Sequence, residues 1–328
     1  MKKHLIELVL CLCCLVTFVG CAANSGASKE AGAASNAGAA SAAPKIVVGT
    51  LATEDILPCW VAQEEGLFAN ENLNAEIAVF QSASELIAAV SSGSVDFAMT
   101  DPMVTTSLYA SGADVQIRWV TLGADASQGR FGIMTADPAI KSLTDLAGMP
   151  VGVGSNTILE YVMDTLFERA GVAADQVKTE ELQKLPVRYQ AMVAGTVKAA
   201  ALPASLLALG EASGFTVVAD DTTGGNISQS VMISCKNAIS TGTVNSFARA
   251  WDAAVTHINA NPDSYRALLA QKASLPESIA QTYAVSSYPA AELPEQHMID
   301  AVLTWMANKG YLNANVTYDA ATGCFQGR

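Results

Sequence analysis

Polar residues stand directly after several short apolar runs, at positions where a ligand could be bound. In the first series of runs they are Thr53, Glu54, Asp55, Ser82, Thr100 and Asp101, and in the second series they are Gly154, Ser155, Asn156 and Thr157. Hydroxyls, carboxylates and the free N–H groups of helix N-termini hold small solutes by hydrogen bonds and charge. The alternative is that these side chains only cap helices. We therefore predict ligand contacts here and no catalytic residue.

The turn 154–157 has the composition of an anion site. It follows the predicted strand 151–153 and opens a long predicted helix, so its first N–H groups lack helical partners. Gly154 permits close backbone approach, and Ser155 and Thr157 add hydroxyl donors. We predict that this turn binds the acidic or most electronegative end of a solute.

Three carboxylates, Glu54, Asp55 and Asp101, are expected near one rim of the same site. If two of them reach the ligand, it should carry an ammonium group or a ring N–H. The alternative is that they are solvated loop charges. Weaker candidates for an anionic group are Arg130, Arg188 and Tyr189.

Residues for catalysis or metal binding are sparse. Outside the N-terminal segment the histidines are His257 and His297, with no HxxxH spacing and no neighbouring cysteine, so no metal is predicted. No GxSxG, P-loop or GxGxxG motif occurs, and no cofactor is predicted. Beyond that segment the cysteines are Cys59, Cys235 and Cys324, an odd number in which one disulfide is allowed but its pairing is open.

The N-terminus has the layout of a secretory signal. Lysines at positions 2 and 3 precede the apolar stretch Leu5–Phe18, and small residues follow before Cys21. Phe18-Val19-Gly20-Cys21 resembles a lipobox, which predicts a lipoprotein signal peptide at 1–20 and acyl chains on Cys21. An ordinary signal peptide that happens to contain Cys21 is the alternative. We expect the mature chain to be exported and anchored to the outer face of the cell membrane, or as a periplasmic lipoprotein.

Residues 21–44 are almost entirely Ala, Gly, Ser and Asn, and they have no large apolar group to bury. Such a segment is typical of a flexible linker between the lipid and a folded domain. The net charge of the chain is −13 with no basic patch, which argues against nucleic acid as a partner.

The folded part alternates apolar runs with helical patterns, which predicts an α/β fold. Strands are expected at 45–52, 74–80, 95–99, 115–122 and 131–135, and again at 151–153, 177–182, 197–202, 215–219 and 230–234. Helices are expected at 58–71, 83–92, 102–111, 158–170, 187–194 and 204–213, and the tail from Thr243 is mainly helical. Residues 89–98 line up with 191–200, so the two series indicate two similar three-layer α/β lobes.

Three stretches resemble one known family. Leu57–Leu73 (LPCWVAQEEGLFANENL), Ser82–Asp101 (SASELIAAVSSGSVDFAMTD) and Lys141–Gly154 (KSLTDLAGMPVGVG) are similar, in that order, to signatures of type 2 periplasmic binding proteins. The nearest subgroup is the SsuA/THI5-like set, which includes binding proteins for sulfonates, taurine, nitrate and thiamine-pyrimidine precursors. The resemblance covers about residues 45–235.

This resemblance implies lobe 1 at 45–132 plus 233–328 and lobe 2 at 133–232. The crossovers of a two-segment hinge would lie near 131–135 and 230–234, with hinge closure around a ligand. It also implies a monomeric, lipid-anchored substrate-binding component of an ABC importer, with ABC permease subunits as partners. A non-transport ligand sensor is the alternative. A THI5-like pyrimidine-precursor enzyme is disfavoured because no cysteine-rich segment occurs beyond the signal.

Overall fold

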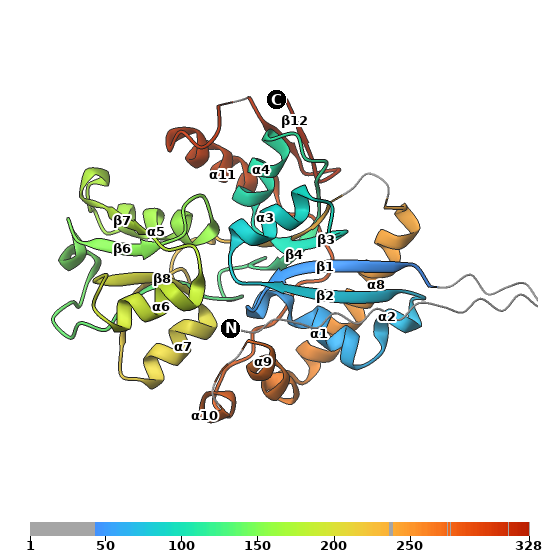
Figure 1. Cartoon of the computed structure of the whole chain (residues 1–328), viewed down its shortest axis with the longest axis horizontal. Helices are drawn as coiled ribbons and strands as arrows, with labels where there is room; N and C mark the ends of the chain where they lie inside the picture. The colour runs from blue at the N-terminus through green and yellow to red at the C-terminus, as the bar shows by residue number, and fades with distance from the viewer. Residues whose placement is uncertain (1–42, 236–238, 274, 276, 314, 328) are drawn as a thin grey trace, which may run out of the picture. The chain divides into compact units, whose positions relative to one another are not determined.

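The computed structural model describes residues 43–235, 239–273, 275, 277–313 and 315–327 (Figure 1). The predicted signal peptide, Cys21 with its predicted lipid and almost all of the predicted linker lie outside this range. In the part of the chain that is described, no helix is long and apolar enough to cross a membrane.

A first five-stranded sheet has the order β2-β1-β3-β10-β4. Its strands are β1 (Lys45–Leu51), β2 (Asn74–Phe80), β3 (Phe97–Thr100), β10 (Ser230–Ser234) and β4 (Gln116–Leu122). Strands β1, β2 and β3 are parallel, whereas β10 runs antiparallel to both of its neighbours, β3 and β4. Both β3 and β10 are buried along their whole length, which explains why they read as continuous apolar runs.

Helices cover both faces of this sheet. Successive side chains of β3 point to opposite faces and are all buried, so each face needs a layer of helices. Phe97 and Met99 pack with helices α1 and α8, and Ala98 packs with α3, α4 and α11 on the other face (Figure 1). The helices of this half are α1 (Leu57–Glu64), α2 (Leu67–Asn70), α3 (Ala83–Ser91), α4 (Pro102–Ala110), α8 (Thr241–Ala260), α9 (Arg266–Lys272), α10 (Glu277–Ala280) and α11 (Gln296–Asn308). Short 3-10 helices lie at η1 (Glu54–Ile56) and η4 (Pro262–Tyr265).

A second five-stranded sheet repeats the arrangement in the order β7-β6-β8-β5-β9. Its strands are β7 (Lys178–Glu181), β6 (Pro150–Val153), β8 (Ala199–Pro203), β5 (Phe131–Thr135) and β9 (Thr216–Asp220). Here β5 is the antiparallel strand, between β8 and β9. The associated helices are α5 (Ile158–Arg169), α6 (Leu185–Val193) and α7 (Ala204–Ala212), with 3-10 turns η2 (Leu143–Leu146) and η3 (Ala174–Gln176). Two sheets of the same order, each flanked by helices, confirm the predicted fold class.

Below, lobe 1 means the elements built on the first sheet and lobe 2 those built on the second. The segments 131–135 and 230–234, near which the crossovers were expected, are the strands β5 and β10, as also predicted, and they lie inside the sheets. Both are fully buried, and their backbone groups pair with a strand on either side. The chain passes between the sheets in residues 123–130 and 221–229, so the predicted limits at 132/133 and 232/233 fall within strands.

Two further features differ from the expected elements. The helix predicted over 58–71 is divided at Gly66, whose φ of +71° is the left-handed conformation that glycine adopts without strain. The tail also contains a β-hairpin, β11 (Thr317–Asp319) paired with β12 (Cys324–Gln326). Cys59 and Cys324 are free thiols in the structure, so no disulfide joins Cys59, Cys235 and Cys324 to one another.

Candidate functional site

A cavity of about 60 Å³ lies between the two lobes. Five of the predicted ligand contacts line it, namely Thr53, Asp55, Thr100, Asp101 and Thr157. They come from the ends of β1 and β3 in lobe 1 and from the start of α5 in lobe 2, because the carboxyl ends of parallel strands meet at one edge of a sheet. The remaining wall includes apolar side chains and the Arg188 guanidinium.

The other predicted contacts lie elsewhere. Glu54 lines a neighbouring cavity of about 650 Å³ between the lobes. Ser82 is the N-cap of α3, with its hydroxyl accepting from the Glu85 N–H at 3.2 Å, as the alternative interpretation expected. Gly154, Ser155 and Asn156 precede α5 but are absent from the wall of the smaller cavity. The structure therefore brings half of the predicted residues together.

Asp101 links the two lobes directly. Its Oδ1 accepts from the Val104 N–H at 2.8 Å, which caps α4, and its Oδ2 accepts from the Ile158 N–H at 3.1 Å, at the start of α5. The side chain is buried, and this burial raises its pKa to about 6 despite these backbone hydrogen bonds. The Asp101 carboxylate thus accepts one free N–H from the first turn of each of two helices, α4 in lobe 1 and α5 in lobe 2.

Glu54 and Asp55 in η1 are not at a solvated rim but fully buried. The Asp55 carboxylate accepts from the Ser230 hydroxyl, and burial raises its pKa. The Glu54 carboxylate accepts from the Tyr283 hydroxyl, and burial raises its pKa to about 8. Burial raises both values because it disfavours the charged form. Within the described residues, neither carboxylate has an ion pair with a basic side chain.

Arg188 is the opposite charge in the cavity wall, and only 2% of it is exposed. Its guanidinium donates to three backbone carbonyls: Nε to Leu182 at 2.8 Å, Nη1 to Ala201 at 3.0 Å and Nη2 to Gln183 at 3.3 Å. Burial lowers its pKa to about 10, an effect that the charge of Glu181 opposes from beyond ion-pair distance. No carboxylate of the described residues forms an ion pair with it.

Arg188 lies against the backbone of Gly154, where a larger residue would crowd its guanidinium. A Cβ at position 154 would lie 2.7 Å from Arg188 Nη2, so only glycine leaves room for the guanidinium beside the strand end. The sequence signal for Arg188 was weak, since an arginine in the first turn of a helix is usually exposed.

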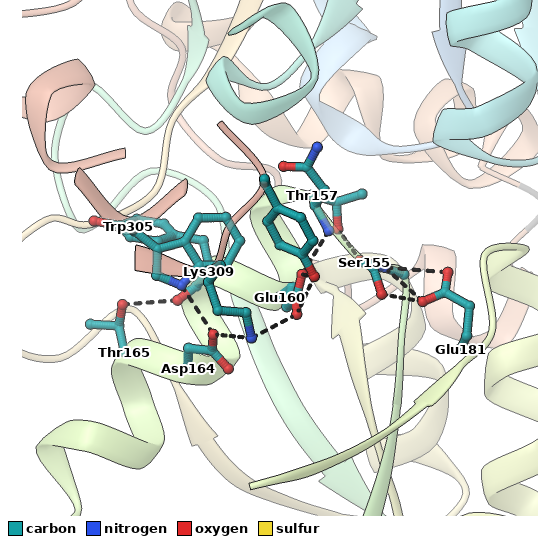
Figure 2. Close-up of polar contacts among 12 residues, drawn as sticks. Ser155, Thr157, Glu160, Asp164, Thr165, Glu181, Trp305 and Lys309 are labelled. Carbon is teal, nitrogen blue, oxygen red and sulfur yellow. Dashed lines mark hydrogen bonds and ion pairs between the residues drawn. The ribbon is translucent and has the colours of Figure 1, made fainter. Parts of the chain in front are cut away.

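The turn 154–157 already has carboxylates from its own chain on its donors (Figure 2). The Ser155 N–H donates to Glu181 Oε2 at 3.1 Å, and the Ser155 hydroxyl donates to the same carboxylate. The Asn156 N–H donates to Glu160 Oε2 at 2.6 Å, and the Thr157 hydroxyl donates to the Gly154 carbonyl at 2.7 Å. That this turn binds the anionic end of a solute stays a prediction, and in this structure its donors are in use.

The arrangement offers charged groups and hydrogen bonds. Among the described residues, no three or more His, Cys, Asp or Glu side chains are grouped to hold a metal ion. The two described histidines, His257 and His297, pair at the surface with Glu65 and Glu295, away from the cavity wall.

Comparison with known proteins gives one family and a set of similar folds. The alkanesulfonate-binding protein SsuA of Xanthomonas axonopodis pv. citri, bound to MOPS, is 16% identical, covers 81% of this chain and 92% of its own, and has a TM-score of 0.67. SsuA of Escherichia coli, an aliphatic sulphonate binding protein, is 15% identical, with coverages of 87% and 92% and a TM-score of 0.68. The nitrate-binding protein NrtA of Synechocystis PCC 6803 is 12% identical, with 83% of each chain covered and a TM-score of 0.68.

At these identities the solved structures establish the fold alone. No curated protein matches the chain significantly. The family model described as NMT1/THI5 like matches residues 53–265, more than half of the chain, and so the chain belongs to the NMT1/THI5-like family.

Proposed function

We propose that this protein is the lipid-anchored, solute-binding component of an ABC importer and that its solute is a small zwitterion. One observation carries the choice of solute. The wall of the small cavity has a buried carboxylate, Asp55, on the side of lobe 1 and a buried guanidinium, Arg188, on the side of lobe 2. Neither has an ion-pair partner within the described part of the chain.

Family and fold support the general role. The chain belongs to the NMT1/THI5-like family, and proteins of similar fold bind alkanesulfonates and nitrate. The N-terminal sequence supports export and a lipid on Cys21. Docking on a permease follows from the same role.

The charges of the cavity select among the solutes that the sequence suggests. A buried guanidinium gains from an anion beside it, and an ammonium group beside Asp55 would favour the ionised carboxylate against the burial that raises its pKa, so a ligand gains most by matching both groups. Nitrate or a simple sulfonate would satisfy Arg188 but leave Asp55 unmatched. A neutral pyrimidine could donate a ring N–H to Asp55 but would give Arg188 no anion. An amino-sulfonate of the taurine type carries both charges.

The size of the cavity agrees with a compact solute. A volume of 60 Å³ compares with about 10–15 Å³ for one water in the same measure, so the space holds only a handful of non-hydrogen atoms. A two-carbon chain between an ammonium group and an oxyanion is of this size.

Calorimetry with four related solutes tests the proposal. Taurine should bind, whereas ethanesulfonate, ethylamine and nitrate, which each lack one charge, should bind at least about tenfold more weakly, a difference of about 1.4 kcal/mol. R188M and D55N should each weaken taurine binding by a similar or larger factor. The control R249M removes an exposed arginine that pairs with Glu71, and it should bind as the unaltered chain does.

Each outcome is informative. Equal affinity for taurine and ethanesulfonate would show that the ammonium site is wrong, and unaltered taurine affinity in R188M would show that the anion lies elsewhere. If none of the four solutes binds, the zwitterion proposal is overturned for compounds of this size.

A further inference from the structure

Glu160, in the first turn of α5, is almost completely buried, with 2% exposed. Its carboxylate accepts from the Asn156 N–H at 2.6 Å within lobe 2. It also accepts from the Tyr311 hydroxyl, at 3.0 Å and 2.9 Å to its two oxygens, and pairs with Lys309 Nζ at 2.9 Å. Its cation and its phenolic donor therefore both come from the segment that ends α11, as Figure 2 shows for Lys309.

That segment belongs to lobe 1. Helix α11 packs on α4 and on β11, and its Ile299, Val302 and Met306 are buried in a hydrophobic cluster that includes Ala98 of β3 and Val104 of α4. Lys309 and Tyr311 directly follow this helix, so their positions are set by lobe 1.

A second acidic residue of α5, Asp164, contacts the same segment of lobe 1 one helical turn after Glu160. Asp164 Oδ2 accepts from the Trp305 indole N–H at 3.0 Å and pairs with Lys309 Nζ at 2.9 Å (Figure 2). The Trp305 ring packs edge-on against Tyr161, with centroids 5.4 Å apart and an interplanar angle of 69°. The contact is thus charged, hydrogen-bonded and aromatic at once.

The same turn of lobe 2 has two further ties to lobe 1. Asn156, which has a φ of +56°, donates from Nδ2 to the Ser107 hydroxyl of α4 at 2.7 Å. The Ile158 N–H donates to Asp101 at 3.1 Å. Thr157, Ile158 and Leu159 line the small cavity, so the residues between these ties form part of its wall.

We propose that Glu160 is a positioning residue that fixes the 154–159 wall of the cavity to lobe 1 and holds the two lobes together before any solute binds. The acceptor capacity of its carboxylate is divided between Asn156 of the turn and the Lys309–Tyr311 pair of the other lobe. Separation of the lobes removes the second set and leaves the turn without its support.

Two readouts on the full-length chain test this without a solute. Trp305 is half-buried at the contact, whereas Trp60, Trp119 and Trp251 are at most 2% exposed in the core of lobe 1, so acrylamide quenching reports on Trp305. Hydrogen exchange of a peptide covering 154–159 reports on the turn in lobe 2. The variant is K309M, in lobe 1. Its matched control is K272M, because Lys272 is similarly exposed, 30% against 33%, but pairs with Glu64 inside lobe 1.

K309M should increase acrylamide quenching of Trp305 at least about twofold, because the fraction of molecules with separated lobes rises from a small value. Exchange at 154–159 should accelerate about fivefold, the scale of a half-buried ion pair. K272M should change neither. Y311F gives an independent variant that keeps the charge and should accelerate exchange in the same peptide. If K309M and Y311F leave both readouts at the values of the unaltered chain and of K272M, the positioning role is overturned. It is equally overturned if the unaltered chain already shows Trp305 as accessible as it is in K309M.

Discussion

Glu54 should make the stability of the protein depend on pH in a direction opposite to that of most carboxylates. Its pKa is about 8 in the folded chain, because burial penalises the charge, against an ordinary value of 4.5. The folded state therefore keeps a proton that the unfolded state has lost. The contribution of this group is fully present below about pH 4.5 and is lost as the pH rises through about 8. Each pH unit in this interval costs about 1.4 kcal/mol, which amounts to about 5 kcal/mol in total.

The variant E54Q removes this titration and keeps an acceptor for the Tyr283 hydroxyl. The difference in the free energy of unfolding, E54Q minus the unaltered chain, should rise with pH by about 1.4 kcal/mol per unit up to pH 8 and then level off. Urea denaturation at pH 5, 6, 7, 8 and 9 measures it. The titrations of Asp55 and Asp221, whose pKa values burial also raises, are present in both proteins and cancel to first order.

A control on the surface isolates the effect of burial. Glu76 pairs with Lys45, and both side chains are about 60% exposed, so E76Q should differ from the unaltered chain by less than about 0.5 kcal/mol at every pH. A flat difference between E54Q and the unaltered chain across pH 5 to 9 would refute the reasoning. It would mean that Glu54 is ionised in the folded protein and that the cleft balances its charge.

Two more changes have defined outcomes. G210A should lower stability by about 1–3 kcal/mol in thermal denaturation, because a Cβ there would lie 2.1 Å from Sδ of the fully buried Met134; G242A, whose Cβ would meet nothing closer than 3.7 Å, should be neutral or stabilising. C21A should move the protein from membranes to the soluble fraction, because the lipid is its predicted anchor, and a membrane-bound C21A protein in cell fractionation would contradict the lipobox interpretation.

Local patterns predicted most of the fold. Buried strands such as β3 and β10 read as apolar runs, and the glycines that end helices marked the repeat between the lobes. Segments 131–135 and 230–234 were predicted as strands, but their places inside the two sheets could not be predicted, because an extended segment looks the same in sequence wherever it pairs. Pairing partners such as Val231 with Thr100 and Val120 are far away in the chain, so only the folded structure shows them.

The candidate site was predicted only in part, because the sequence shows where strands end but not which distant segments come into contact. Strand ends located Thr53, Thr100 and Asp101 beside the cavity, because the topology alone brings them to one edge. Arg188 was underrated because its burial depends on the carbonyls of Leu182 and Ala201, which belong to other segments of lobe 2. Spacing in the sequence carries no sign of these contacts.

The start of α5 shows why donor-rich turns are poor guides to where an anion binds. The turn has the free N–H groups, hydroxyls and glycine of an anion site, yet the chain supplies its own anions there. Glu181 meets Ser155, Glu160 meets Asn156, and Asp101 meets Ile158. A helix N-terminus attracts any carboxylate within reach. A carboxylate that the fold already holds there loses no translational or rotational freedom on binding, whereas a solute does. Under the proposed function, a solute would instead be selected by the groups of this cavity that have no ion-pair partner in the described part of the chain, Asp55 and Arg188.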